Sequence, residues 1–108
     1  MNFKHEELGV KFEIPEPLTL RHLEIWEKGR LDAMEAGART VVSLRWLAAR
    51  LIVTNWECEA LPDPKMNKDA ISGEQLRVIA WVGLEVERYV QGLLSIPKAR
   101  SGRRPSQP

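Results

Sequence analysis

Residues 40–56, TVVSLRWLAARLIVTNW, form the most apolar stretch of the chain and decide its predicted fold. Projected as a helix at about 100° per residue, the polar side chains of this region fall within a narrow arc of about 60°. They are Ser43, Arg50, Thr54 and the adjacent Glu57. A helix that is apolar almost all round is buried in protein or in a membrane. A membrane span needs about 20 apolar residues, and two arginines interrupt this shorter run, so we expect a helix covered by protein, with no membrane contact.

Arg45 lies in the middle of the apolar side of this predicted helix, near Val41, Ala49 and Ile52. Its aliphatic stem can cover apolar surface while the guanidinium reaches water. Alternatively, the charge meets an acidic group on a partner. The polar strip is also too narrow for two flanking helices to account for the apolar surface, which indicates that the N-terminal strand, the acidic loop, another subunit or a partner covers the remainder.

Composition indicates one small domain with an uneven charge distribution. The chain has 108 residues, a formal net charge of +1 and a single cysteine. Residues 97–108 contain four bases and no acid, so residues 1–96 carry 16 − 4 = 12 bases against 15 acids. One cysteine excludes an intramolecular disulfide and fits a reducing cytosol. The N-terminus lacks the apolar region of a signal peptide, and we therefore expect a cytoplasmic protein.

Alternation in residues 8–14, LGVKFEI, predicts one strand that ends at Pro15 and Pro17. Because a single strand is not stable alone, it pairs with N-terminal residues or lies extended across the helices, in this subunit or another. The lone strand and the four tryptophans suggest self-association. A dimer or ring that exchanges the N-terminal segment is a hypothesis on these grounds.

Two further helices flank the central one. Thr19 is a candidate N-cap for a first helix that runs to about residue 36. Its predicted apolar face consists of Leu20, Leu23, Trp26, Leu31, Ala33 and Met34. Ser72 and Gln75 have the spacing of a capping box for a third helix that runs to about Ser95. Gly83 lies within the apolar stripe of that helix and predicts a close approach between helices.

The predicted fold class is therefore mainly α. It comprises an N-terminal extended or strand arm over residues 1–18, a three-helix domain over residues 19–96, and a disordered basic tail over residues 97–108. The tail has no interleaved aromatic residues, so we expect at most a weak, salt-sensitive contact with nucleic acid.

Trp81 is out of place on the polar face of the third helix, among Arg77, Glu85 and Arg88. Either a loop folds over it, or it stacks on the flanking arginines. The alternative is an exposed aromatic anchor for a partner.

Residues that could carry catalysis are scarce. Cys58 lies between Glu57 and Glu59, whose carboxylates disfavour a thiolate. His5 and His22 have no partner at metal-ligand spacing, and the acidic residues of the loop after Trp56 do not have EF-hand spacing. We expect no enzyme activity, no cofactor and no metal. An enzyme subunit is the least favoured class.

Three segments resemble the siphophage tail assembly chaperones, small proteins encoded between the tail tube and tape-measure genes. The segments are KFEIPEPLTLRHLEIWEKGR, LAARLIVTNWECEALPDP and VIAWVGLEVERYVQGLLSIPK, and the resemblance spans about residues 8–98. It implies a mostly helical, non-enzymatic protein of the host cytoplasm that binds the tape-measure protein, and the tail tube protein as well, during tail assembly.

A chaperone for an extended helical client needs apolar anchors ringed by charge. The candidate contact residues are Ile25, Trp26, Arg45, Arg77, Trp81 and Arg88. The alternative function is a small helical phage-type regulator or inhibitor, such as an anti-defence protein, that binds a protein or nucleic-acid complex.

Overall fold

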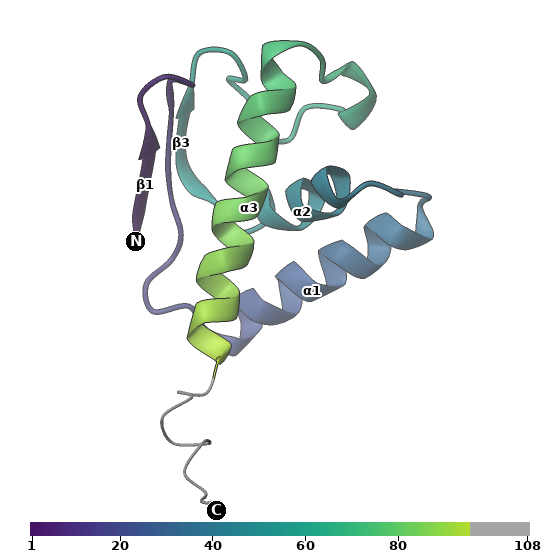
Figure 1. Ribbon diagram of the computed structural model, residues 1–108. Helices are drawn as coiled ribbons and strands as arrows, with labels where there is room; N and C mark the ends of the chain where they lie inside the picture. Colours follow the sequence, from purple (N-terminus) through teal and green to yellow (C-terminus); the bar gives the residue numbers. More distant parts are fainter. Residues whose placement is uncertain (96–108) are drawn as a thin grey trace, which may run out of the picture.

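The computed structural model describes residues 1–95, and the predicted basic tail lies outside the described residues. Along the chain the elements are β1 (Asn2–His5), β2 (Val10–Glu13), α1 (Leu20–Glu35), α2 (Val41–Ala49), β3 (Thr54–Cys58), a short 3₁₀ helix (Lys68–Ala70) and α3 (Glu74–Leu94). Figure 1 shows a sheet on one side of α3 and the helices α2 and α1 on the other.

The predicted fold class is wrong. The protein is a small α/β domain, in which a three-stranded antiparallel sheet of order β1–β2–β3 joins the three helices. The N-terminal segment contains two strands where one was predicted, and they pair with each other from Asn2↔Glu13 to His5↔Val10. The strand at residues 10–13 therefore finds both of its partners within the chain.

The missing third strand comes from the central stretch, where one long helix was predicted. α2 ends at Ala49, and Arg50 caps it while its guanidinium donates to the Met66 carbonyl oxygen at 3.1 Å. The chain then turns and enters β3, which pairs antiparallel with β2. The β-branched residues that follow Leu51 favour this extended backbone. The stretch is apolar on nearly all sides because it supplies both a helix and a strand to one core.

Asn55 marks an irregularity in β3. The register between β2 and β3 shifts between Lys11 and Glu13, so β3 contains one extra residue there. Asn55 has a positive φ of 49°, a conformation that asparagine tolerates better than most residues. Trp56 and Cys58 belong to the core together with Val10 and Phe12, in the regular part of the ladder, and the extra residue brings Thr54 opposite Glu13.

The core lies between the sheet and α3, and it accounts for the surplus of tryptophan. Phe12 is fully buried at its centre, with ring centroids 6.0 Å from both Trp56 and Trp81. Trp46 packs on Trp56 at 5.7 Å, and Trp56 Nε1 donates to the Leu61 carbonyl oxygen at 2.6 Å. The four tryptophans, which were predicted to favour self-association, all lie in the core or pack against it.

Gly83 produces the predicted close approach of α3 to α2. A Cβ atom at this position would lie 2.8 Å from the Arg45 Cβ and 3.1 Å from the Trp46 backbone nitrogen. The helices can cross at this distance only because Gly83 has no side chain.

α1 begins as predicted but buries a narrower stripe than predicted, with Trp26 and Ala33 buried and Leu23 packed against the core. Thr19 is its N-cap, and the backbone N–H of Thr19 donates to His22 Nδ1 at 3.1 Å. Trp26, Gly29 and Ala33 are the buried residues, because α1 packs chiefly against α2 and along a narrow stripe. Three residues of the predicted core face are instead exposed: Leu20, Leu31 and Met34.

α3 runs to Leu94, close to the predicted end. Only half of the predicted capping box forms: the Ser72 N–H donates to Gln75 Oε1 at 2.9 Å, whereas the N-cap residue is Gly73 and makes no side-chain cap bond.

Candidate partner-binding surface

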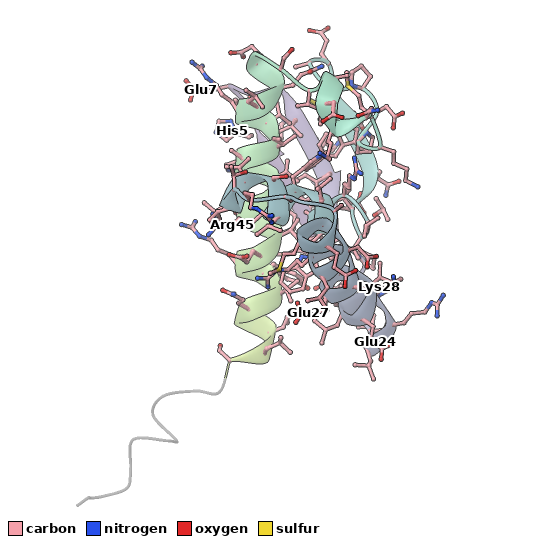
Figure 2. The ribbon with its side chains drawn as sticks, turned by 90° about the vertical axis from the view of Figure 1, so that its right-hand side faces the viewer. His5, Glu7, Glu24, Glu27, Lys28 and Arg45 are labelled. Atoms are coloured by element: carbon pink, nitrogen blue, oxygen red, sulfur yellow. The ribbon has the colours of Figure 1, made fainter. Side chains whose placement is uncertain are left out.

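The three predicted contact residues of α3 lie along one side of the helix, but they differ in exposure. Arg77 and Arg88 are exposed and pair within the helix, with Glu74 at 3.5 Å and with Glu85 at 3.4 Å. Trp81 is half-buried, because the sheet covers it: its ring meets His5 edge-on at 5.1 Å and also contacts Phe12. Figure 2 shows His5 beside α3. Another part of the chain therefore covers Trp81, as in the interpretation with a loop over it, but the covering part is the sheet and not a loop.

The predicted contact residues of α1 lie largely inside the protein. Trp26 is 3% exposed, and the Arg30 guanidinium covers its ring at 5.2 Å from the centroid. Ile25 is half-buried and packs against the edge of the core. Neither residue stands out from the surface as an anchor.

Arg45 finds its acidic partner within the same chain. Its Nε donates to Glu87 Oε2 of α3 at 3.0 Å, and both side chains are partly buried. This ion pair joins α2 to α3 one helical turn after Gly83, where the two helices are closest. The guanidinium is therefore already engaged, although Figure 2 shows that Arg45 remains at the surface.

The side chains that could carry catalysis do not form a cluster, and each is either buried or hydrogen-bonded to the backbone. Cys58 is buried as a free thiol in β3. His5 Nδ1 accepts from the Leu8 N–H at 3.2 Å, and His22 Nδ1 accepts from the Thr19 N–H. Within residues 1–95, no three His, Cys, Asp or Glu side chains are placed to hold one metal ion.

An apolar hollow of about 170 Å³ opens between the first turns of α2 and α3. We call this the α2–α3 hollow. Val42 and Leu76 stand at its rim, 38% and 49% exposed, and Trp46 and Ile71 lie in its buried wall. Thr40, Ser43 and Lys68 add polar groups to the lining. Trp46 Nε1 is the one buried side-chain nitrogen or oxygen of residues 1–95 without a hydrogen-bond partner.

A second apolar groove, of about 320 Å³, runs between the start of α1 and the end of α3. Its lining includes Leu20, Leu93 and Leu94, which are 70%, 54% and 58% exposed. A third depression, of about 270 Å³, lies between α1 and α2 beside Gly29, Leu47 and Leu51. The helical side of the molecule therefore presents several apolar depressions, whereas the outer face of the sheet carries charged residues such as Lys11 and Glu57.

Sequence reasoning missed the residues of the α2–α3 hollow and of the second groove. It assigned Leu20 to the core face of the first helix, and it assigned the apolar stripe of the third helix, which includes Leu76 and Leu93, to the core as well. The pattern at Trp26, Gly29 and Ala33 was the available signal in α1, since two small residues at helical spacing indicate the face that another helix approaches. The rim of the α2–α3 hollow has no comparable signal, because it depends on where the loop after β3 returns the chain to α3.

The longest helix, α3, and the other helices of residues 1–95 fall short of the length and apolar character that a membrane crossing requires. Comparisons of the chain with protein-family models, with curated proteins and with solved structures found no match.

Proposed function

We propose that this protein is a non-enzymatic binding protein that holds a helical client through the α2–α3 hollow. The supporting observation is the hollow itself, with its exposed rim of Val42 and Leu76 and its buried apolar wall. Isolated exposed apolar residues are ordinary on protein surfaces, but a lined depression with an apolar rim is the form of a side-chain acceptor site.

The size of the hollow matches one large apolar side chain. Its volume is about 170 Å³, and burial of one leucine-sized or phenylalanine-sized side chain contributes about 1.5–3 kcal/mol. Such a contact is weak by itself, and a client that repeats the anchor along its length gains affinity from many copies of the protein. Reversible, repeated binding suits a chaperone for a long helical protein.

Together with the sequence resemblance, this surface supports the function of a tail assembly chaperone. The client is then the phage tape-measure protein, bound in the host cytoplasm before the tail tube assembles around it. The tail tube protein is the second proposed partner.

Co-expression with the candidate tape-measure protein tests this proposal. We expect the client to be soluble with the wild-type chain and to precipitate with the Leu76→Asp variant, since aspartate places a charge at the rim of the hollow. Leu31→Asp is the matched control, because Leu31 is also an exposed helical leucine, 60% exposed against 49% for Leu76, and does not line the hollow. Equal client solubility with both variants contradicts a role for the hollow. No gain in solubility with the wild-type chain contradicts the chaperone function, and purification with a host protein in its place favours a regulator or inhibitor.

A further inference from the structure

The strand β1 forms an open edge of the sheet. β2 pairs with β1 on one side and with β3 on the other, and Figure 1 shows β1 at the outer margin with no described element beyond it. The N-terminus extends this ladder, because Met1 N donates to the Ile14 carbonyl oxygen at 3.2 Å and Ile14 N donates to the Met1 carbonyl oxygen at 2.9 Å.

This pairing determines which backbone groups of β1 face outward. Hydrogen-bonded and non-hydrogen-bonded pairs alternate along an antiparallel ladder. Since Met1 and Ile14 form a hydrogen-bonded pair, Phe3 and His5 also direct their N–H and C=O groups toward β2. Asn2 and Lys4 therefore direct theirs away from the sheet, where a further strand can pair with them.

On the face of the sheet that packs against α3, Phe3 of β1 is the outermost member of a row of aromatic side chains. Phe3 stacks on Phe12 with ring centroids 4.8 Å apart and planes 6° apart, and the edge of Tyr89 meets Phe3 at 6.0 Å. Phe3 is only half-buried, because nothing in the described chain covers its side at the open edge.

The charges on the outer face do not prevent a strand from approaching. An edge lysine normally discourages pairing, but Lys4 Nζ lies 3.2 Å from Glu6 Oε2. Lys4 also faces Lys11 across the ladder, and Asn2 faces Glu13. An incoming strand that places a positive charge next to Asn2 therefore improves the charge pattern of this face.

We propose that β1 pairs antiparallel with β1 of a second copy of this chain, to form a six-stranded sheet across a two-fold axis at Phe3. In this register Asn2 of each copy exchanges hydrogen bonds with Lys4 of the other, and the two Phe3 side chains meet as a non-hydrogen-bonded pair. The neighbouring register, in which Lys4 meets its own copy, places like charges directly opposite each other and is disfavoured.

A second copy fits this edge better than an unrelated strand because the edge is self-complementary. The Phe3 pair joins the two aromatic rows into one. On the other face of the sheet, Lys4 of one copy lies next to Asn2 of the second copy, and Glu13 of the second copy lies on the strand after that. Lys4 and this Glu13 are then two strand spacings apart, about 10 Å, a distance that their long side chains can span. The inference goes beyond the proposed client binding and does not rest on it.

A backbone-specific variant tests the proposal. Lys4→Pro deletes the outward N–H but leaves the bonds between β1 and β2, and proline is tolerated at strand edges. Lys4→Thr is the matched control, because it removes the same charge and keeps the N–H. We expect sedimentation velocity at micromolar concentrations to show dimers for the wild type and for Lys4→Thr. Lys4→Pro removes two of the four intermolecular bonds and should raise the dimer dissociation constant at least about tenfold.

Cross-linking supplies a test that does not require the proline variant to fold. We expect a mixture of the Asn2→Cys and Lys4→Cys proteins to form a heterodimeric disulfide faster than either protein alone, because position 2 faces position 4 across the axis. A monomeric wild type, dimers unaffected by Lys4→Pro, or equal cross-linking of all combinations overturns the proposal. An edge that pairs only with a strand of the client gives the first of these results.

Discussion

At the scale of single residues, Gly83 has the sharpest consequence. A methyl group there would meet the backbone of α2, at 3.1 Å from the Arg45 carbonyl carbon and from the Trp46 nitrogen. Because backbone cannot move aside cheaply, we expect Gly83→Ala to lower the free energy of unfolding by about 1–3 kcal/mol in urea denaturation. Gly92→Ala is the control, since nothing lies within 4 Å of its added methyl group. This control should stabilise α3 by about 0.5–1 kcal/mol, and equal effects of both variants would contradict the close-contact explanation.

Lys28 allows a prediction about a single ionisable group. A hydrogen bond from its Nζ to Asp32 Oδ2, at 2.8 Å, and the charge of that carboxylate raise the pKa of Lys28, with a smaller contribution from Glu35. A raised lysine pKa means that the pair stabilises the fold below the unfolded-state pKa and loses this effect as pH rises through the folded-state pKa.

In an NMR titration of the Lys28 side chain, Asp32→Asn should therefore lower the pKa toward its ordinary value. Glu35→Gln should lower it less. A larger shift in the glutamine variant would show that Asp32 is not the principal cause.

At the scale of elements, the bulge in β3 depends on the left-handed backbone of Asn55. A β-branched residue pays about 1–2 kcal/mol in that conformation, so Asn55→Val should destabilise the protein by this amount in thermal or urea unfolding. Asn55→Gly should be nearly neutral, because glycine adopts a positive φ without strain. Glu57→Val, at an exposed position in the regular part of β3, controls for the change to valine, and a loss equal to that of Asn55→Val would remove the bulge as the cause.

The same stretch shows how far the fold follows from sequence. The helix starts at Thr19 and Thr40 were predictable, because a side-chain oxygen at an N-cap acts locally on the first turn. β3 was not predictable, because an apolar run that supplies a helix and then a strand to one core has no polar break between them. The Arg50 bond to Met66, which helps to end α2, joins residues that are distant in sequence.

The candidate surface was predictable in part, for a related reason. Spacing correctly placed Arg77, Trp81 and Arg88 on one side of α3, since helical periodicity is local. It could not show that strands β1 and β2 cover Trp81, or that Arg45 meets Glu87, because both depend on tertiary packing. Leu76, the exposed leucine at the rim of the hollow, was assigned to the core because the apolar stripe of a helix does not show how far along it the neighbouring helix extends.

At the scale of the whole molecule, α3 separates the two proposed binding regions. The sheet packs on one side of α3 through Trp81 and Tyr89, and α2 packs on the other side at Gly83 (Figure 1). The β1 edge and the α2–α3 hollow therefore share no contact residue. One copy can pair with another through its sheet and still present its hollow to a client, which would let pairs of copies bind two anchors at once.

This separation predicts that the two activities are independent. Lys4→Pro should weaken the dimer and leave the intrinsic affinity for a short single-anchor client peptide unchanged, whereas Leu76→Asp should do the reverse. Distant sites without shared partners act additively, so the double variant should show both defects at the sizes of the single variants. Sedimentation and peptide titration on the four proteins measure this.

A change in dimerisation caused by Leu76→Asp would show that the hollow is itself part of the self-association surface, or that α3 transmits a rearrangement between its two sides. For a long client with repeated anchors, the Lys4→Pro protein should lose more affinity than for the short peptide, because only a paired protein can hold two anchors together.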